Sequence, residues 1–147
     1  MIKRIWHTGF VVKDIQRAIK FYREGMGLHL VDLRDVQGEG ISHLVGYNNA
    51  RLLEAFFSLK PNGTMDDVSV ILIEYASPRT DKQMPAERNY AAAAHLAFYV
   101  DDVDAAYHRL LAHGAKKLNP PADVRPGHKV VYLQDPDGNW LELCEDK

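Results

Sequence analysis

The segment HTGFVVKD at residues 7–14 has a counterpart in HLAFYVDD at residues 95–102, and the offset between them is 88 residues. Five identities share this offset: His7 with His95, Phe10 with Phe98, Val12 with Val100, Asp14 with Asp102, and Ala18 with Ala106. Several matches at one fixed offset are typical of a duplicated structural unit. We therefore expect two copies of one module.

Each copy passes from an apolar strand through an aspartate into an amphipathic helix. Asp14 and Asp102 are suitable N-caps, because a carboxylate can accept hydrogen bonds from the first turn of a helix. Apolar residues follow both aspartates at helical spacing. Glycines are suited to end the two helices: Gly25 and Gly27 follow the first, and Gly114 follows the second.

Three strands are expected after each helix. They are 28–35, 52–59 and 68–75 in the first copy, and 116–119, 129–134 and 139–144 in the second. The segment Asp135-Pro136-Asp137-Gly138 predicts a tight turn between the last two. Each copy is thus a βαβββ module in an α+β fold, with module one at 1–78, a linker at 79–92, module two at 93–147, and one domain overall. Residues 37–50 form either a short helix or a lid.

The composition excludes several functional classes. The 147 residues are 46% apolar and 26% charged with a net charge of −2, which is typical of a soluble globular protein. No basic stripe predicts nucleic-acid binding. No signal peptide or membrane-length apolar run is present, so we expect a cytoplasmic protein without a membrane partner. Cys144 is the only cysteine and is expected to be a buried strand residue.

Four polar side chains interrupt apolar strands at related places. Strand alternation is expected to put His7, Glu74, His95 and Glu142 on the faces away from the helices. A single strand histidine or glutamate usually has a structural or solvated role, but here the pattern occurs twice. Buried carboxylates need compensation, which a divalent cation with two imidazole ligands provides.

Other residues on these faces are expected to line a substrate pocket. These are Val11, Leu72, Tyr99 and Trp140, with His128 added from the loop before a strand. Simple packing is the alternative for the aromatic residues. Arg51, Arg79 and Arg125 are candidates to contact an anionic substrate, although arginines are more often solvated.

Four segments resemble the vicinal oxygen chelate superfamily, which includes glyoxalases, bleomycin-resistance proteins and extradiol dioxygenases. They are HTGFVVKDIQRAIKFYREGMGL, LIEYASP, HLAFYVDDVDAAYHRLLAHGA and VVYLQDPDGNWLELCE. The resemblance covers nearly the whole chain. It implies two paired βαβββ modules whose curved, cup-shaped mixed sheet carries helices on its outer face, and it favours a homodimer.

The ligand pattern resembles that of glyoxalase I, which has His-Glu-His-Glu where this chain has His7, Glu74, His95 and Glu142. Methylmalonyl-CoA epimerases usually have glutamine in place of Glu74. Extradiol dioxygenases use two histidines and one carboxylate, and bleomycin-binding members lack the ligands. Bacterial glyoxalase I commonly has arginine where this chain has Val11 and asparagine where it has Pro78, so glutathione is in question as cosubstrate.

The resemblance implies a divalent-metal-dependent lyase or isomerase acting on a small oxygenated or thioester substrate. The cation would be Ni, Zn, Co, Mn or Fe. Glu142 is the first candidate for the base that removes a proton next to a carbonyl, and Glu74 is the second. The alternatives are a methylmalonyl-CoA epimerase-like enzyme, an Fe(II) extradiol dioxygenase, and a non-catalytic small-molecule binding protein.

Overall fold

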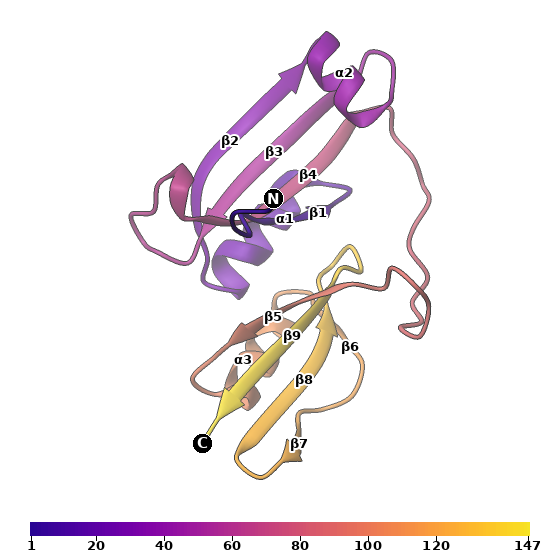
Figure 1. Cartoon of the computed structure of the whole chain (residues 1–147). Helices are drawn as coiled ribbons and strands as arrows, with labels where there is room; N and C mark the ends of the chain where they lie inside the picture. Colours follow the sequence, from indigo (N-terminus) through magenta and orange to yellow (C-terminus); the bar gives the residue numbers. More distant parts are fainter. The chain divides into compact units, whose positions relative to one another are not determined.

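The computed structural model describes all 147 residues and divides the chain into two compact units, Met1–Asp81 and Lys82–Lys147 (Figure 1). The boundary lies within the predicted linker. Each unit has a first strand, a helix and a set of later strands in the same order. The predicted α+β class is confirmed. Three strands follow the first helix of unit 1, as expected for a βαβββ module, whereas four strands follow the helix of unit 2.

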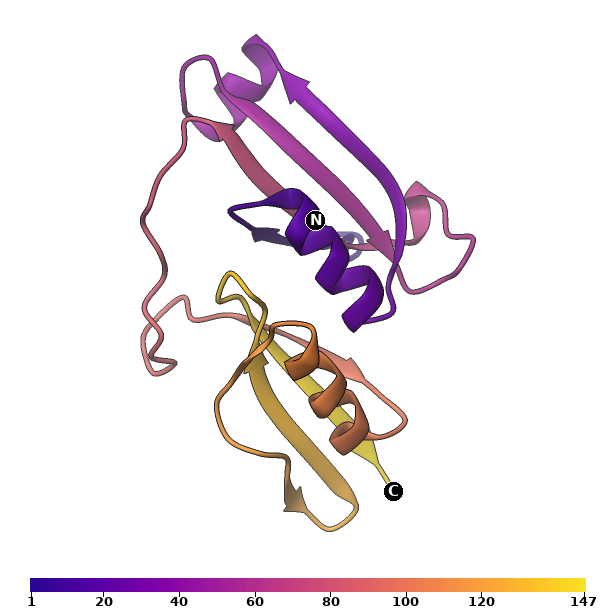
Figure 2. The same cartoon turned by 180° about the vertical axis from the view of Figure 1, so that it is seen from behind.

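Unit 1 contains a four-stranded sheet with α1 on one face (Figures 1 and 2). The strand order is β1-β4-β3-β2; β1 is parallel to β4, and the other pairs are antiparallel. The elements are β1 (Thr8–Val11), α1 (Ile15–Lys20), η1 (Phe21–Gly25), β2 (His29–Gln37), α2 (Glu39–Val45), β3 (Arg51–Ser58), η2 (Met65–Asp67) and β4 (Val68–Ser77).

The position of α1 follows from its cap and its apolar side. The Asp14 carboxylate accepts hydrogen bonds from the backbone N–H groups of Gln16 and Arg17 at 2.9 and 3.0 Å. Tyr22 in η1 is fully buried, and its ring lies 6.0 Å from that of Phe57 in β3. Helix α1 and the adjoining η1 therefore pack against β3 and β4 and form the apolar interior of unit 1 with them.

Unit 2 repeats this arrangement with one strand more. Its sheet has the order β5-β9-β8-β6, β7 also pairs with β8, and β5 is parallel to β9. The elements are β5 (His95–Tyr99), α3 (Val103–Ala112), β6 (Lys116–Lys117), β7 (Ala122–Arg125), β8 (His128–Gln134) and β9 (Trp140–Asp146). The strand β7 was not predicted, and the strand expected at 116–119 ends at Lys117.

Local signals in unit 2 act as expected. Asp102 caps α3 by accepting a 2.9 Å hydrogen bond from the Ala105 N–H. The buried Asp135 carboxylate accepts hydrogen bonds from the N–H groups of Asp137 and Asn139, both at 2.9 Å. These bonds form the predicted turn and fix the register between β8 and β9.

Residues 37–50 hold the helix α2, which resolves the alternative left open by the sequence. Gly38 precedes the helix with φ 116°, and Gly46 ends it with φ 75°, a left-handed conformation that favours glycine. No helix in the structure combines the length and apolarity that crossing a membrane requires.

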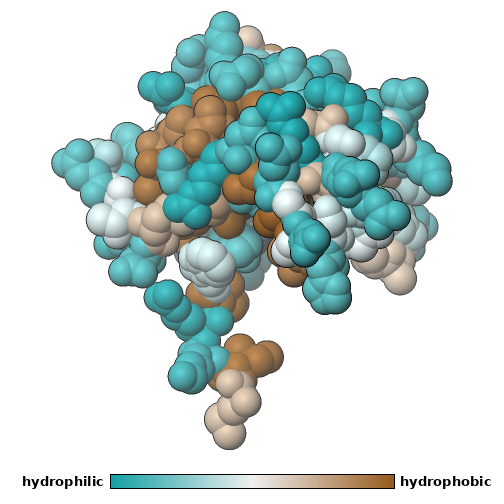
Figure 3. All heavy atoms as spheres, turned by 90° about the horizontal axis from the view of Figure 1, so that it is seen from above, coloured by the Kyte–Doolittle hydropathy of each residue, from teal (hydrophilic) through white to brown (hydrophobic).

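Most of the surface seen from above is hydrophilic, with apolar side chains between the polar ones (Figure 3). Large exposed apolar residues occur near the N-terminus and in α2, and they include Ile2, Ile5 and Leu44.

Candidate metal centre

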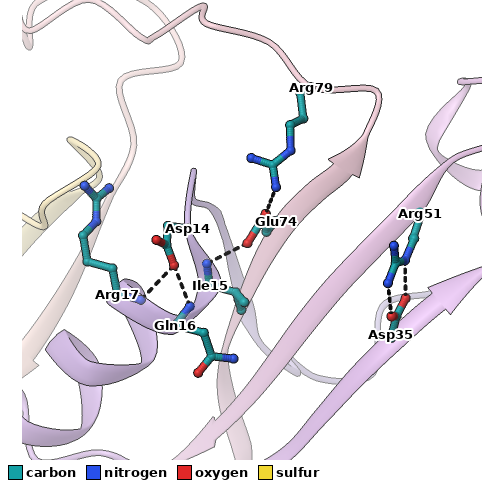
Figure 4. A network of polar contacts seen from close by, with 8 residues as sticks. All are labelled: Asp14, Ile15, Gln16, Arg17, Asp35, Arg51, Glu74 and Arg79. Carbon is teal, nitrogen blue, oxygen red and sulfur yellow. Dashed lines mark hydrogen bonds and ion pairs between the residues drawn. The ribbon is translucent and has the colours of Figure 1, made fainter.

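The side chains of β4 alternate between the helix-covered face and the opposite face. Leu72 is fully buried, and the Glu74 carboxylate on the same side accepts a 2.8 Å hydrogen bond from the backbone N–H of Ile15, the first residue of α1 (Figure 4). Both side chains therefore face α1. The prediction that Leu72 and Glu74 lie on the face away from the helix was wrong, because β4 is apolar on both faces and its sequence does not distinguish them.

Glu74 is also paired with a guanidinium group. Its Oε1 atom lies 2.6 Å from Nη2 of Arg79, and only 7% of its side chain is exposed (Figure 4). A helix N-terminus carries partial positive charge, and a charge-assisted bond to arginine adds to it. These two partners account for the buried charge without a metal ion.

The counterpart of Glu74 in unit 2 is Glu145. Its Oε2 atom accepts a 2.9 Å hydrogen bond from the N–H of Val103, the first residue of α3. Ile15 and Val103 are themselves related by the 88-residue offset. The two glutamates therefore have the same role, which is to hold the start of each helix on the last strand of its unit.

The strand register identifies the counterpart of Glu142. Ala97 in β5 is paired with Glu142 in β9, and Gly9 in β1 is paired with Ile71 in β4. Gly9 and Ala97 are equivalent in the repeat. Ile71 therefore occupies the position in unit 1 that Glu142 occupies in unit 2, and it is buried in an apolar cluster with Phe56.

Unit 2 brings three polar side chains together on the face away from α3. The Nε2 atom of His95 lies 2.9 Å from Oε2 of Glu142. The Tyr132 hydroxyl donates to the same Oε2 atom at 3.0 Å and lies 3.4 Å from His95 Nε2. Tyr132 reaches this position because it is paired directly with Glu142 across β8 and β9.

Burial raises the pKa of the Tyr132 phenol, and its hydrogen bond to Glu142 raises it further. The phenol therefore remains a hydrogen-bond donor at neutral pH. Sequence reasoning missed Tyr132, although the register implied by the Asp135–Gly138 turn would have placed it opposite Glu142.

Arg88 completes this cluster, and sequence reasoning missed it as well because it lies in the predicted linker. Its guanidinium carbon lies 3.8 Å from the Tyr132 ring centroid and 4.6 Å from that of Trp140. Its Nη2 atom lies 3.3 Å from Nδ1 of His95. A cation above two aromatic faces is a favourable arrangement.

His7 immediately precedes β1 in unit 1. Its Nδ1 atom is buried and has no hydrogen-bond partner, and its ring lies 4.4 Å from that of Trp6. An unpaired imidazole nitrogen is suited to a metal ion or a hydrogen-bonding ligand. Neither unit alone brings three or more His, Cys, Asp or Glu side chains together as a possible metal site.

The remaining predicted pocket residues have different environments. Trp140 is buried, whereas Val11 and Tyr99 are exposed. His128 is hydrogen-bonded to Asp146, which lowers the pKa of the Asp146 carboxyl. The negative charge of Asp146 raises the pKa of Tyr99, so His128 and Tyr99 meet at one carboxylate near the end of β9.

The chain belongs to the Glyoxalase/Bleomycin resistance protein/Dioxygenase superfamily, whose family model matches residues 4–143. The predicted resemblance is thereby confirmed at the level of the family.

Three relatives match nearly the whole chain. It is 32% identical to the uncharacterized protein YwbC of Bacillus subtilis, over 99% of each chain. It is 29% identical to a 2-epi-5-epi-valiolone epimerase of an Actinomyces species, covering 95% of this chain and 77% of that protein. It is 28% identical to a probable lactoylglutathione lyase of Vibrio parahaemolyticus, covering 98% of this chain and 91% of the relative.

Solved structures share the fold. A glyoxalase family protein of Bacillus cereus has a TM-score of 0.85 at 24% identity, with 99% of this chain and 95% of that chain covered. The fosfomycin resistance protein FosX of Mesorhizobium loti has a TM-score of 0.57 at 26% identity, with 97% and 91% covered.

Proposed function

We propose that the chain is a divalent-metal-dependent lyase or isomerase that moves a proton next to a carbonyl group of a small substrate. The contact that carries the proposal is the 2.9 Å approach of His95 Nε2 to Glu142 Oε2. Relatives named as lactoylglutathione lyase and as an epimerase support this reaction class.

We further propose His7, His95 and Glu142 as the metal ligands. Two imidazoles and one carboxylate form a donor set suited to Zn, Mn, Fe, Co or Ni. The unpaired Nδ1 atom of His7 fits the same assignment. Glu74, first expected to be the fourth ligand, is instead proposed as a structural residue because α1 and Arg79 already satisfy its carboxylate.

When bound, a divalent cation would supply Lewis-acid polarisation of the substrate carbonyl and stabilise the developing enolate. Glu142 is the proposed base, which accepts the proton from the carbon next to that carbonyl and returns it to a neighbouring atom. Tyr132 donates to Glu142 and holds the carboxylate in position. Glu74 holds the start of α1 and takes no part in the proton transfer.

Solvent deuterium exchange tests this function. The metal-loaded chain is incubated in D₂O with panels of α-hydroxy thioesters and acyl-CoA compounds, and deuterium incorporation next to the carbonyl is followed by NMR. We expect incorporation by the wild type and little by Glu142→Gln. Absence of exchange with every divalent metal and every substrate of both panels would overturn the proposal.

A second candidate is an Fe(II)-dependent ring-cleaving dioxygenase, and one observation favours it. Ile71 replaces the second carboxylate, so the remaining set of two histidines and one glutamate matches the facial triad used by non-haem iron oxygenases. Oxygen consumption with a catechol by protein loaded anaerobically with Fe(II) would select this candidate over proton transfer.

A further inference from the structure

Arg88 has a partly buried positive charge without a carboxylate partner. Its Nη1 atom is buried and makes no hydrogen bond. Its Nη2 atom lies 3.3 Å from Nδ1 of His95, which is an imidazole nitrogen and not a carboxylate oxygen. A desolvated cation without a counter-ion is costly, often by several kcal/mol. The two aromatic rings beneath it offset only part of such a cost.

Arg51 and Arg79, in contrast, are paired with carboxylates. Arg79 binds Glu74, and Arg51 binds Asp35 through two nitrogens at 2.9 and 2.6 Å (Figure 4). Glu142 is the carboxylate nearest in sequence to Trp140, but it contacts His95 and Tyr132. Arg88 therefore differs from Arg51 and Arg79, two arginines first considered for substrate binding.

We infer that Arg88 binds an anionic group of the substrate beside His95 and Glu142. The inference rests on the proposed function, and it names the substrate class as compounds that carry a carboxylate or a phosphonate-type group. The planar guanidinium can donate two parallel hydrogen bonds to such an oxyanion. Nη1 supplies a donor that no protein group uses.

The charge of the proposed ligand set favours the same substrate class. A doubly charged cation with two neutral imidazoles and one carboxylate keeps one positive charge, because Ile71 replaces a second carboxylate. Arg88 adds a second positive charge next to His95. A neutral substrate would leave both charges uncompensated, whereas a carboxylate would offset one of them and a doubly ionised phosphonate would offset both.

The test is calorimetric titration of the full chain loaded with Zn²⁺ or Mn²⁺. Glycolate and methylphosphonate serve as the anionic probes and hydroxyacetone as the neutral one. We expect Arg88→Met to weaken binding of at least one anion by about 10- to 100-fold, since a hydrogen bond to a charged group contributes on this scale. Binding of hydroxyacetone should not change.

Lys117→Met is the matched control, because it removes one positive charge from an exposed position of unit 2. Arg88→Lys keeps the positive charge but lacks the planar guanidinium group, so its anion affinity should lie between those of the wild type and Arg88→Met. The anion that the wild type binds more tightly, glycolate or methylphosphonate, shows whether the substrate group is a carboxylate or a phosphonate.

Equal anion affinities in the wild type and Arg88→Met, or an equal loss in Lys117→Met, would overturn the inference. Metal analysis of the same samples reports separately on the proposed function. Repeating the titrations on metal-free protein tests Arg88 even if no metal binds, and thermal unfolding checks that the variants are folded.

Discussion

Two glutamates of β9, Glu142 and Glu145, lie three residues apart and have different environments. Glu142 contacts His95 and Tyr132, whereas Glu145 contacts the first N–H group of α3. Strand β4 contains only one glutamate, and it is the counterpart of Glu145. At the scale of single residues, backbone hydrogen bonding therefore separates a structural carboxylate from a candidate metal ligand.

Glu74→Gln should lower the free energy of unfolding by about 1–3 kcal/mol, because a buried charge-assisted hydrogen bond to α1 is weakened. Urea unfolding measures this loss. Glu145→Gln is the matched variant in unit 2 and should show a loss of similar size. A Glu74→Gln protein of unchanged stability would contradict the structural role.

Tyr132→Phe should retain the bound metal and lower the rate of deuterium exchange by about 10- to 100-fold, since Glu142 loses the donor that orients it. The measurement compares metal content with exchange rate in the same sample. If the variant loses its metal as well as its deuterium exchange, Tyr132 is needed for metal binding and not only to orient Glu142 as the base. An unchanged rate would exclude both roles.

At the scale of helices and strands, the sequence predicted the features that depend on residues close together in the chain, which are helix caps and turns. The caps Asp14 and Asp102 and the turn at Asp135–Gly138 correctly located both helices and the last hairpin. The strand β7 was missed because ADVR at 122–125 is a short, fully exposed segment between Pro121 and Pro126, and prolines next to a short run predict a loop. The face of β4 was assigned wrongly because VSVILIEY is apolar on both sides, and only the pairing with β1 resolves it.

The same pairing predicts the effect of a designed carboxylate. Ile71→Glu places a glutamate at the position equivalent to Glu142, so it should destabilise the metal-free chain and show a larger metal-induced rise in Tm than the wild type. Ile73→Glu, two residues further on the same face, is the control and should destabilise without this gain. Thermal unfolding with and without metal distinguishes the two variants. Equal metal-induced shifts would count against the equivalence of Ile71 and Glu142.

At the scale of the whole molecule, the duplication is unequal. Both units keep the histidine at the start of the first strand, but only unit 2 keeps the carboxylate and adds Tyr132. The repeat, the strand alternation and the family resemblance made His7, His95 and Glu142 candidates. They could not exclude Glu74, because the partners of that side chain come from the start of α1 and from Arg79.

The most direct test is the metal content per chain of five purified proteins: the wild type, His7→Ala, His95→Ala, Glu142→Gln and Glu74→Gln. Loss of a ligand should release the ion, whereas loss of a structural carboxylate should not. We expect about one ion per chain in the wild type and in Glu74→Gln, and a large loss in the other three. Retention of metal by Glu142→Gln together with its loss from Glu74→Gln would contradict the proposed ligand set.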